Sequence, residues 1–348
     1  MFEEIEAILK SHNSINVPTN NIQKAAIQLM TNDLRFIYSV IKHQNIVKGN
    51  YFVALMPYMG VIIDGVEDWV KSYNNSSKHK LSIPVFTSEE QMFYEAMRNA
   101  IKLFELDFEG INNLLKKKYQ ESDKYFSSLC KPLAKLLHIY DIYGVFTCNN
   151  IPCNNTILEQ CYIPFFEYGK DDKETIKSMA QIGGKFVACF GAIPSYDVNL
   201  SFVFDSTDYG GLIKSPFGSN YNRKFLLFSI LCQINFVLFA IGDFIVDETT
   251  TKLRIAYILY YYLIIIMPKI NYHFNSNFQI NDNYFLDSFR NAMAHYKLGV
   301  ALKESEIVYS DPFFGLTQKF FGKDYTTVKT DIYNELKNIK TQIELFLK

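Results

Sequence analysis

The sequence predicts a mostly α-helical protein with an antiparallel helical bundle towards its C-terminal end. Apolar residues recur three or four positions apart through most of the chain, which is the spacing of one helix face. Hydrophobic residues make up 49% of the 348 residues, enough to build a sizeable core. The best strand candidate is the alternating segment 199–205 (NLSFVFD), so we expect a small irregular or β insertion near 185–220.

Changes in composition divide the chain into three regions. Cysteine, asparagine and proline gather in 144–162, and a glycine-rich loop follows at 208–222. We therefore expect a helical N-terminal region at 1–150 whose role the sequence does not reveal, a connecting segment at 151–220 and a helical domain at 221–348.

Capping signals and breakers set the expected helices of the first two regions. Thr87 and Glu90 have the spacing of a capping box, and Gly110 follows the helix that they open. A glycine pair at 183–184 closes another helical pattern. The expected helices are 2–10, 21–48, 87–108, 111–120, 132–143 and 171–182.

The last region holds the clearest helical patterns, joined mostly by short links that favour antiparallel neighbours. The expected helices are 223–246, 252–270, 282–298 and 326–347. The final one carries an apolar stripe at alternating spacings of three and four residues, which predicts one packed face. That stripe consists of Val328, Ile332, Leu336, Ile339, Ile343 and Phe346.

Two apolar runs raise the question of a membrane. Residues 225–246 are long enough to span a bilayer, but they include Gln233, Asn235 and Asp243, which are costly in hydrocarbon. Residues 255–267 are too few to span. We therefore expect a buried helical hairpin and no membrane.

The start of the chain and its cysteines favour a cytoplasmic protein. The segment after Met1 is acidic and amphipathic, unlike a secretory signal. The six cysteines are scattered, which suggests reduced thiols. Cys148, Cys153 and Cys161 lack the paired spacing of a zinc knuckle, so no metal site is expected there.

The segment 281–299 is the most informative stretch of the chain. Asn281 or Asp282 is a suitable N-cap, and Gly299 is a suitable C-terminal residue for a helix. Its apolar stripe consists of Phe285, Phe289, Met293 and, as an alternative to a binding role, Tyr296.

Three polar residues, Arg290, Asn291 and His295, lie off this stripe, and their chemistry suits RNA cleavage. A histidine can transfer protons near neutral pH, and an arginine can neutralise the charge that builds on a phosphate. An amide such as Asn291 can orient a phosphate or hold the imidazole. Because His295 lies in the last turn of the expected helix, the helix dipole should favour its protonated form.

This R-N-x-x-x-H pattern resembles the R-x4-6-H motif of the HEPN superfamily, a set of all-α domains that includes many metal-independent RNA endonucleases. The resemblance covers the motif helix and, loosely, the helical pattern from about residue 220 to the end. It implies an RNA substrate, no metal or other cofactor, products with 2′,3′-cyclic phosphate ends, and a homodimer in which two motifs line one cleft. A toxin or an anti-phage defence effector is the function that it suggests.

Flanking residues extend the expected site. Ser288 and Lys297 are candidates for substrate binding, and Tyr296 either stacks on a base or belongs to the core. Some HEPN toxins carry R-x4-H-x-Y, whose tyrosine a partner enzyme modifies. Tyr296 stands one place early for that pattern, which puts this form of regulation in doubt, although an antitoxin or regulatory partner fits the class.

Two alternatives remain open from the sequence. The alternative to a ribonuclease is a non-catalytic helical binding or scaffold protein, in which Arg290 pairs with a carboxylate and His295 caps a helix end. Asp64, Glu67 and Asp68 also lie close enough to suggest a metal or acid site, although a solvated helix face is the interpretation that we favour.

Overall fold

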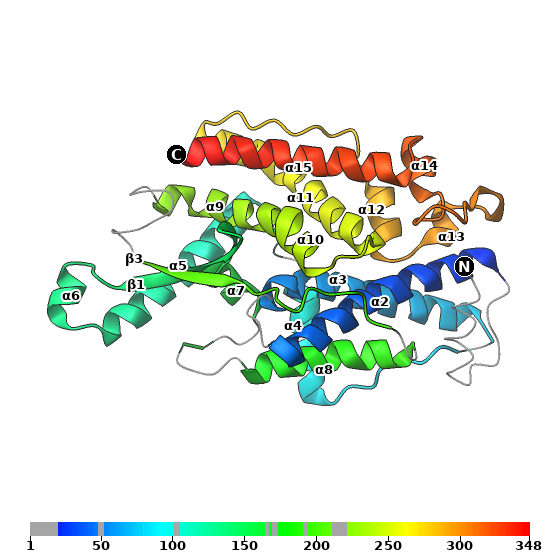
Figure 1. The fold of residues 1–348 in the computed structure, drawn as a ribbon, viewed down its shortest axis with the longest axis horizontal. Helices are drawn as coiled ribbons and strands as arrows, with labels where there is room; N and C mark the ends of the chain where they lie inside the picture. The colour runs from blue at the N-terminus through cyan, green and yellow to red at the C-terminus, as the bar shows by residue number, and fades with distance from the viewer. Residues whose placement is uncertain are drawn as a thin grey trace.

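The computed structural model is mostly helical, which confirms the predicted fold class (Figure 1). The predicted helix at 2–10 lies outside the described part of the chain. The described residues are 20–47, 52–78, 80–100, 103, 105–163, 167–168, 173–190, 194–210 and 221–348.

A long central helix organises the N-terminal half. In α3 (Phe52–Ser76) almost every residue of the first three turns is buried. Helices α2 (Asn21–Val47), α4 (Ser88–Ala100) and α8 (Lys173–Cys189) pack against it and form the lower half of the molecule in Figure 1. The capping box that opens α4 is confirmed, because Thr87 and Glu90 exchange hydrogen bonds of 2.9 and 3.2 Å.

The C-terminal helices form the opposite half. The predicted helix at 223–246 is confirmed, although a π-helical turn interrupts it. The predicted stripe of the last helix, α15 (Tyr325–Leu347), is buried, except that Leu347 takes the place of Phe346. Helix α15 packs on both α9 and α11. The elements are α9 (Tyr221–Asn235), the π turn (Phe236–Ala240), α10 (Ile241–Phe244), α11 (Thr250–Phe274), α12 (Asp287–Ala294), α13 (Leu298–Ala301), a 3-10 turn (Glu304–Glu306), α14 (Leu316–Phe321) and α15 (Tyr325–Leu347).

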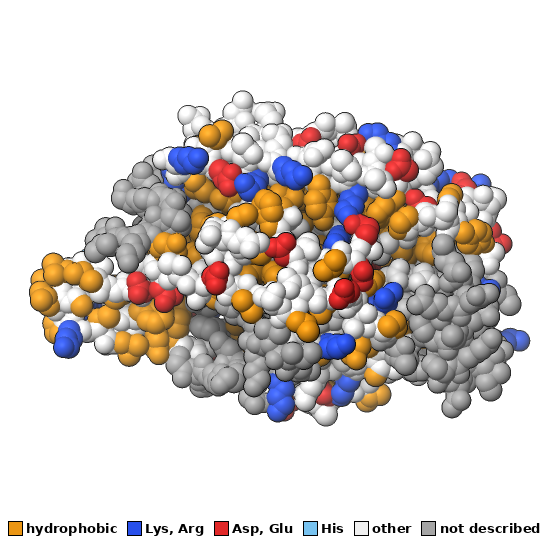
Figure 2. Space-filling view, viewed as in Figure 1, with side chains coloured by type: hydrophobic (Ala, Val, Ile, Leu, Met, Phe, Trp, Pro, Cys, Tyr) orange, Lys and Arg blue, Asp and Glu red, His pale blue; other side chains and the backbone are white. Residues whose placement is uncertain are grey.

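A small sheet with three helices extends to one side of these halves. The sheet has the order β2-β1-β3 and both pairs are antiparallel. Its elements are α5 (Phe108–Leu129), α6 (Pro132–Leu136), β1 (Asp141–Cys148), β2 (Ile151–Asn155), α7 (Thr156–Tyr162) and β3 (Asp205–Gly210). Figure 1 places α6 at the outer tip, and Figure 2 shows hydrophobic side chains at that tip, where Leu133 and Leu136 are 66% and 75% exposed.

Several predicted boundaries here were wrong. The helix expected at 132–143 ends at Leu136, after which the chain turns and enters β1. The predicted strand at 199–205 meets the sheet only at Asp205, where β3 begins, so the β insertion near 185–220 is confirmed through β3 alone. Gly110 lies in the first turn of α5 and does not end a helix, since Asp107 caps that turn through the Gly110 amide at 2.8 Å.

The hairpin of β1 and β2 depends on two asparagines. Asn149 and Asn150 connect the strands with φ angles of 52° and 63°, the left-handed region that asparagine tolerates best after glycine. Two such residues match the right-handed twist of the flanking strands. This Asn-Asn pair is the sequence signal that would have identified the hairpin.

One hydrophobic core spans the three regions expected from composition. Buried residues from α2, the sheet and α15 belong to a single contiguous cluster. The boundaries at 150 and 220 therefore do not separate independent cores.

Within the described residues, two helices are long and apolar enough to cross a membrane, 224–244 and 250–274, with mean hydropathies of 2.2 and 1.5. In each, 78% of the apolar window is buried inside the protein. The structure is therefore compatible with a soluble protein in which these helices form the core.

Candidate functional site

The motif helix α12 is short and is held by its apolar side. Phe289 and Met293 are buried as predicted, whereas Phe285 precedes the helix and is 37% exposed. The predicted caps were wrong: Leu286 is the N-cap and His295 the C-cap. The chain cannot continue as a helix towards Gly299 because Tyr296 has a φ of 51°.

His295 faces a carboxylate from the central helix α3. Its Nδ1 atom lies 3.3 Å from Oδ2 of Asp68, and its side chain is 24% exposed. Asp64 stands one turn before Asp68 on the same face of α3. One ligand atom from each of Asp64, Asp68 and His295 lies within 4.8 Å of the others, a grouping that could hold a divalent cation.

A second arginine joins the cluster from α4. Nε of Arg98 lies 2.6 Å from Oδ1 of Asp64, and the Arg98 side chain is 50% exposed. The neighbouring Glu67 accepts a hydrogen bond from the Tyr94 hydroxyl and pairs with Lys71 at 2.8 Å. The acidic face of α3 is thus matched by Arg98 from α4, by Lys71 of α3 itself and by the imidazole after α12.

Two glycines on α3 make this convergence possible. A Cβ atom at Gly65 would lie 1.9 Å from the carbonyl oxygen of Ala294, and one at Gly60 would lie 2.3 Å from that of Met97. Without side chains at these positions, the ends of α12 and α4 approach the α3 backbone directly. The next residues along the chain, His295 and Arg98, are thereby brought to the two aspartates.

The structure reverses the expected protonation of His295. Burial lowers its pKa below the ordinary value of 6.5, with help from the charges of Lys297 and Arg290, and the Asp68 carboxylate only partly opposes this. The predicted helix-dipole effect does not prevail. Burial also raises the pKa of Asp64, and the charge of Asp68 adds to this while Arg98 opposes it.

Arg290 is held over an aromatic ring. Its guanidinium carbon lies 5.3 Å from the ring centre of Tyr261, whose hydroxyl donates a hydrogen bond of 2.6 Å to Asp287. Arg290 is half-buried, and its buried Nε atom makes no hydrogen bond within the described residues. The Tyr261 ring therefore orients the guanidinium, which also interacts with the hydroxyl of that tyrosine.

The other predicted site residues divide into two groups. Ser288, Asn291 and Lys297 are exposed on or beside α12. Tyr296 is fully buried, and its hydroxyl donates to Oδ2 of Asp33 at 2.7 Å. It therefore belongs to the core, and base stacking by this ring does not fit the structure.

The sequence did not reveal that the aspartates of α3 and the residues of α12 form one cluster. Asp64 and Asp68 were interpreted as a solvated helix face, and nothing in the sequence connected them with His295. Their signal was the four-residue spacing of the aspartates, which places both on one helix face.

No family model, curated protein or solved structure matches this chain. Its class is therefore defined by its own architecture, a mostly α-helical protein with one extended core. Within that class, its distinguishing feature is the surface cluster of Asp64, Asp68, Arg98, Arg290 and His295.

Proposed function

We propose that this chain is a cytoplasmic endoribonuclease of the HEPN type, which cuts RNA by attack of a ribose 2′-hydroxyl on the adjacent phosphate. The observation that carries the proposal is the contact between His295 Nδ1 and Asp68 at 3.3 Å. Nδ1 is buried on this side and makes no hydrogen bond within the described residues, so Nε2 is the atom that we expect to exchange protons with substrate.

The lowered pKa of His295 suits a base. A neutral imidazole accepts the proton of the attacking 2′-hydroxyl and later returns one to the leaving 5′-oxygen. Arg290 neutralises the charge on the phosphate, and Arg98, half-exposed beside Asp64, adds a second cation at the same place. Asn291, Ser288 and Lys297 lie exposed on the same stretch, where they can contact RNA.

The proposed assembly is a homodimer in which two motifs line one cleft, consistent with the exposed position of Asn291 and Lys297. Toxicity in a toxin–antitoxin pair or in anti-phage defence is the biological role that we propose. Light scattering of the purified protein measures its molar mass and so tests whether it is a dimer.

Cleavage of total RNA in EDTA tests the activity. We expect His295→Ala to lower the rate by about 10²–10⁴-fold and Arg290→Ala by about 10²–10³-fold, with 2′,3′-cyclic ends on the wild-type products. Asp68→Asn should give a smaller loss, since it alters the orientation of the imidazole and lowers the pKa of His295 further but leaves the imidazole itself in place. Asp282→Asn, an exposed aspartate just before α12, is the matched control.

The same assay separates a second candidate, metal-assisted hydrolysis at Asp64, Asp68 and His295. The specific observation in its favour is that their ligand atoms lie within 4.8 Å of one another. Activity that vanishes in EDTA, returns with Mn²⁺ or Mg²⁺ and is lost in Asp64→Asn would establish this chemistry. RNA binding without cutting under either condition would instead favour the non-catalytic helical binding protein.

A further inference from the structure

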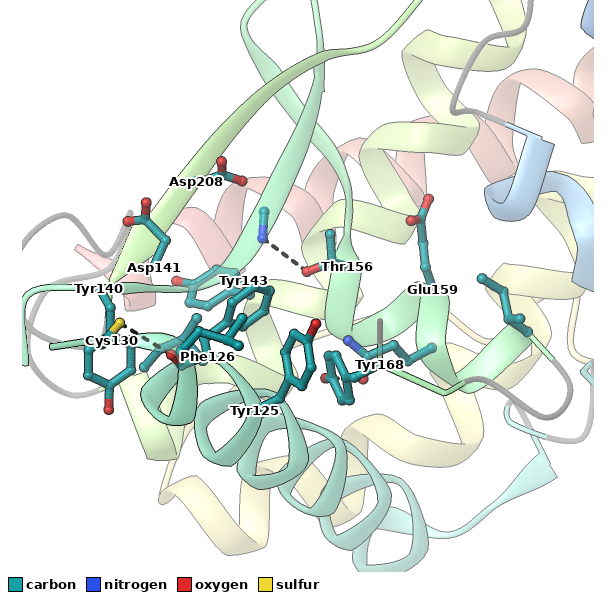
Figure 3. Close-up of a pocket in the computed structure, with 15 residues that line it drawn as sticks. Tyr125, Phe126, Cys130, Tyr140, Asp141, Tyr143, Thr156, Glu159, Tyr168 and Asp208 are labelled. Carbon is teal, nitrogen blue, oxygen red and sulfur yellow. Dashed lines mark hydrogen bonds between the residues drawn. The ribbon is translucent and has the colours of Figure 1, made fainter. Parts of the chain in front are cut away.

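A cavity lies within the small sheet and its helices, between α5, α7 and the strands β1 and β3. Its volume is about 730 Å³, within the range of pockets that hold small molecules. None of the residues that line it belongs to the cluster around His295. Figure 3 shows its aromatic side chains on one side and carboxylates at its edges.

Aromatic rings form much of the wall. The rings of Tyr125 and Tyr168 are stacked with their centres 4.8 Å apart, and Phe126 meets Tyr125 edge-on at 5.2 Å. The Tyr168 hydroxyl donates to Gln160 at 2.7 Å, which fixes that ring in place. The faces of such rings carry negative electrostatic potential and attract cations.

The charge of the cavity has one sign. Asp141, Glu159 and Asp208 line it, and among the described residues that line it there is no lysine, arginine or histidine. Asp141 and Asp208 come from paired strands and are exposed, with no ion pair to either carboxylate within the described part of the chain. Like charges left without counter-ions raise the local affinity for a cation.

A glycine on β1 allows the Asp208 carboxylate and α7 to approach the strand closely. Gly144 pairs with Asp208 across β1 and β3, and a Cβ atom at position 144 would lie 3.0 Å from Oδ1 of Asp208. The same atom would lie 3.2 Å from the methyl group of Thr156 on α7. Asp208 and Thr156 therefore pack closely against the backbone of β1, and a side chain at position 144 would displace them.

We infer that this cavity binds a small organic cation, an amine or amidinium attached to an apolar or aromatic body. The rings accommodate the apolar body and the face of the cation, and Asp141 and Asp208 accept hydrogen bonds from its N–H groups. Anionic ligands such as nucleotides are excluded by the same carboxylates. The site therefore differs in ligand chemistry from the arginine-containing cluster at His295.

Three ligands of one shape test the inference. Benzamidine is cationic, benzamide neutral and benzoate anionic, and saturation-transfer NMR with the full-length protein measures the binding of each. We expect benzamidine to bind, benzamide to bind at least fivefold more weakly, and benzoate to show no transfer. Benzamidine binding should weaken as salt is added, because charge attraction is screened.

Variants assign the binding to the cavity. Asp141→Asn/Asp208→Asn should lower benzamidine affinity at least tenfold, and Tyr168→Leu should lower it through loss of the ring face. The matched control is Asp205→Asn, which makes the same change on β3 three residues away from Asp208 and outside the cavity. Melting curves of all variants report whether the fold is retained.

Three results would overturn the inference. One is equal binding of benzoate and benzamidine, and another is benzamidine binding that the double variant leaves unchanged. The third is an absence of binding by benzamidine and by spermidine at 10-fold molar excess over about 1 mM protein. Binding of a lysine-rich peptide without binding of either small cation would assign the surface to a partner chain instead.

Discussion

The carbonyl oxygen of Ala294 lies against the Cα atom of Gly65, so closely that a Cβ atom added at position 65 would be 1.9 Å from it. This contact joins the end of the motif helix α12 to the middle of α3. Asp64 and His295 are the neighbours of these two residues along the chain, so the distance between the helices sets the geometry of the cluster.

Gly65→Ala should therefore disturb both folding and activity. The added methyl group meets backbone, which cannot rotate away, so α12 must shift, and we expect a loss of about 3 kcal/mol in the free energy of unfolding. RNA cleavage by the folded fraction should fall as well, because His295 moves away from Asp68. Urea denaturation and the EDTA cleavage assay measure the two effects.

Gly242→Ala is the control for this substitution. Gly242 lies in the short helix α10, and apart from the backbone of its own helix and its chain neighbours, no described residue places a heavy atom within 4 Å of a Cβ built there. Alanine there should be neutral or slightly stabilising, since glycine weakens helix interiors. Equal behaviour of the two variants would show that the α3–α12 contact does not control the site.

The local parts of this site were predictable, and the distant parts were not. Arg290 and His295 are five positions apart, so their spacing on the chain was enough to select them. Asp68 joins them across more than 200 residues, and its contact with His295 depends on a glycine whose role appears only when two helices meet. Periodicity identifies helix faces, but it does not identify which faces pack together.

The fold likewise divides into local features that the sequence predicted and features that it did not. The stripe of α15 was predicted because it repeats over six turns, whereas the hairpin of β1 and β2 was missed. Its strands are short and largely buried, so they show little alternation, and its turn uses Asn149 and Asn150 in place of glycine. The burial that lowers the pKa of His295 could not be predicted from the sequence either, because it arises from tertiary packing.

Arg254→Met should be strongly destabilising. Arg254 and Asp33 are 1% and 0% exposed, with Nε of the arginine 2.8 Å from Oδ2 of the aspartate. Removal of one partner leaves a buried charge, so we expect a loss of about 3–5 kcal/mol in urea denaturation. Lys329→Met, which breaks the more exposed pair with Glu248, should cost less than about 1 kcal/mol.

The double variant Asp33→Leu/Arg254→Met should recover only part of that loss. It removes the buried charge, but it also removes the acceptor of the Tyr296 and Thr251 hydroxyls. The terminal nitrogens of Arg254 make no hydrogen bonds within the described residues. Replacement of such a pair by apolar residues is often neutral. A double variant as unstable as the sum of the single ones would instead show that the pair itself stabilises the fold.

Tyr296→Phe separates the core role of this tyrosine from a role in RNA binding. The substitution removes only the hydroxyl that donates to Asp33, while Thr251 still donates to the same carboxylate at 2.7 Å. We expect the unfolding free energy to fall by about 1.5–3 kcal/mol, since the lost bond is to a charged group. Cleavage per folded molecule at a temperature well below unfolding should be unchanged. Weakened RNA binding with unchanged stability would instead show that the Tyr296 hydroxyl contacts RNA.

His43→Gln should reduce the loss of stability that the protein suffers in mild acid. His43 is fully buried beside the ring of Phe244 at 5.2 Å, and a ring nitrogen lies 3.2 Å from the carbonyl oxygen of Asn199. Burial lowers the pKa of His43 below 6.5, although the bond to Asn199 opposes this.

The sign of the effect follows from proton binding. Between the ordinary pKa of about 6.5 and the lower pKa of the folded protein, the unfolded chain holds the extra proton. The contribution of His43 to the unfolding free energy is therefore fully present above pH 6.5 and decreases as the pH drops through this window. Below the pKa of the folded protein, His43 causes no further loss. Glutamine stays neutral and retains an N–H donor for Asn199, so His43→Gln removes this contribution.

Urea denaturation at pH 7.5 and pH 5.5 measures the contribution of His43 to the pH dependence of the unfolding free energy. The wild type should lose more unfolding free energy between the two conditions than His43→Gln does, while the contribution of His295 is common to both and cancels. His138→Asn, at an exposed histidine with a left-handed φ of 49°, should keep the wild-type difference. If His43→Gln and the wild type lost equal stability on acidification, protonation of the buried His43 would not be what weakens the fold.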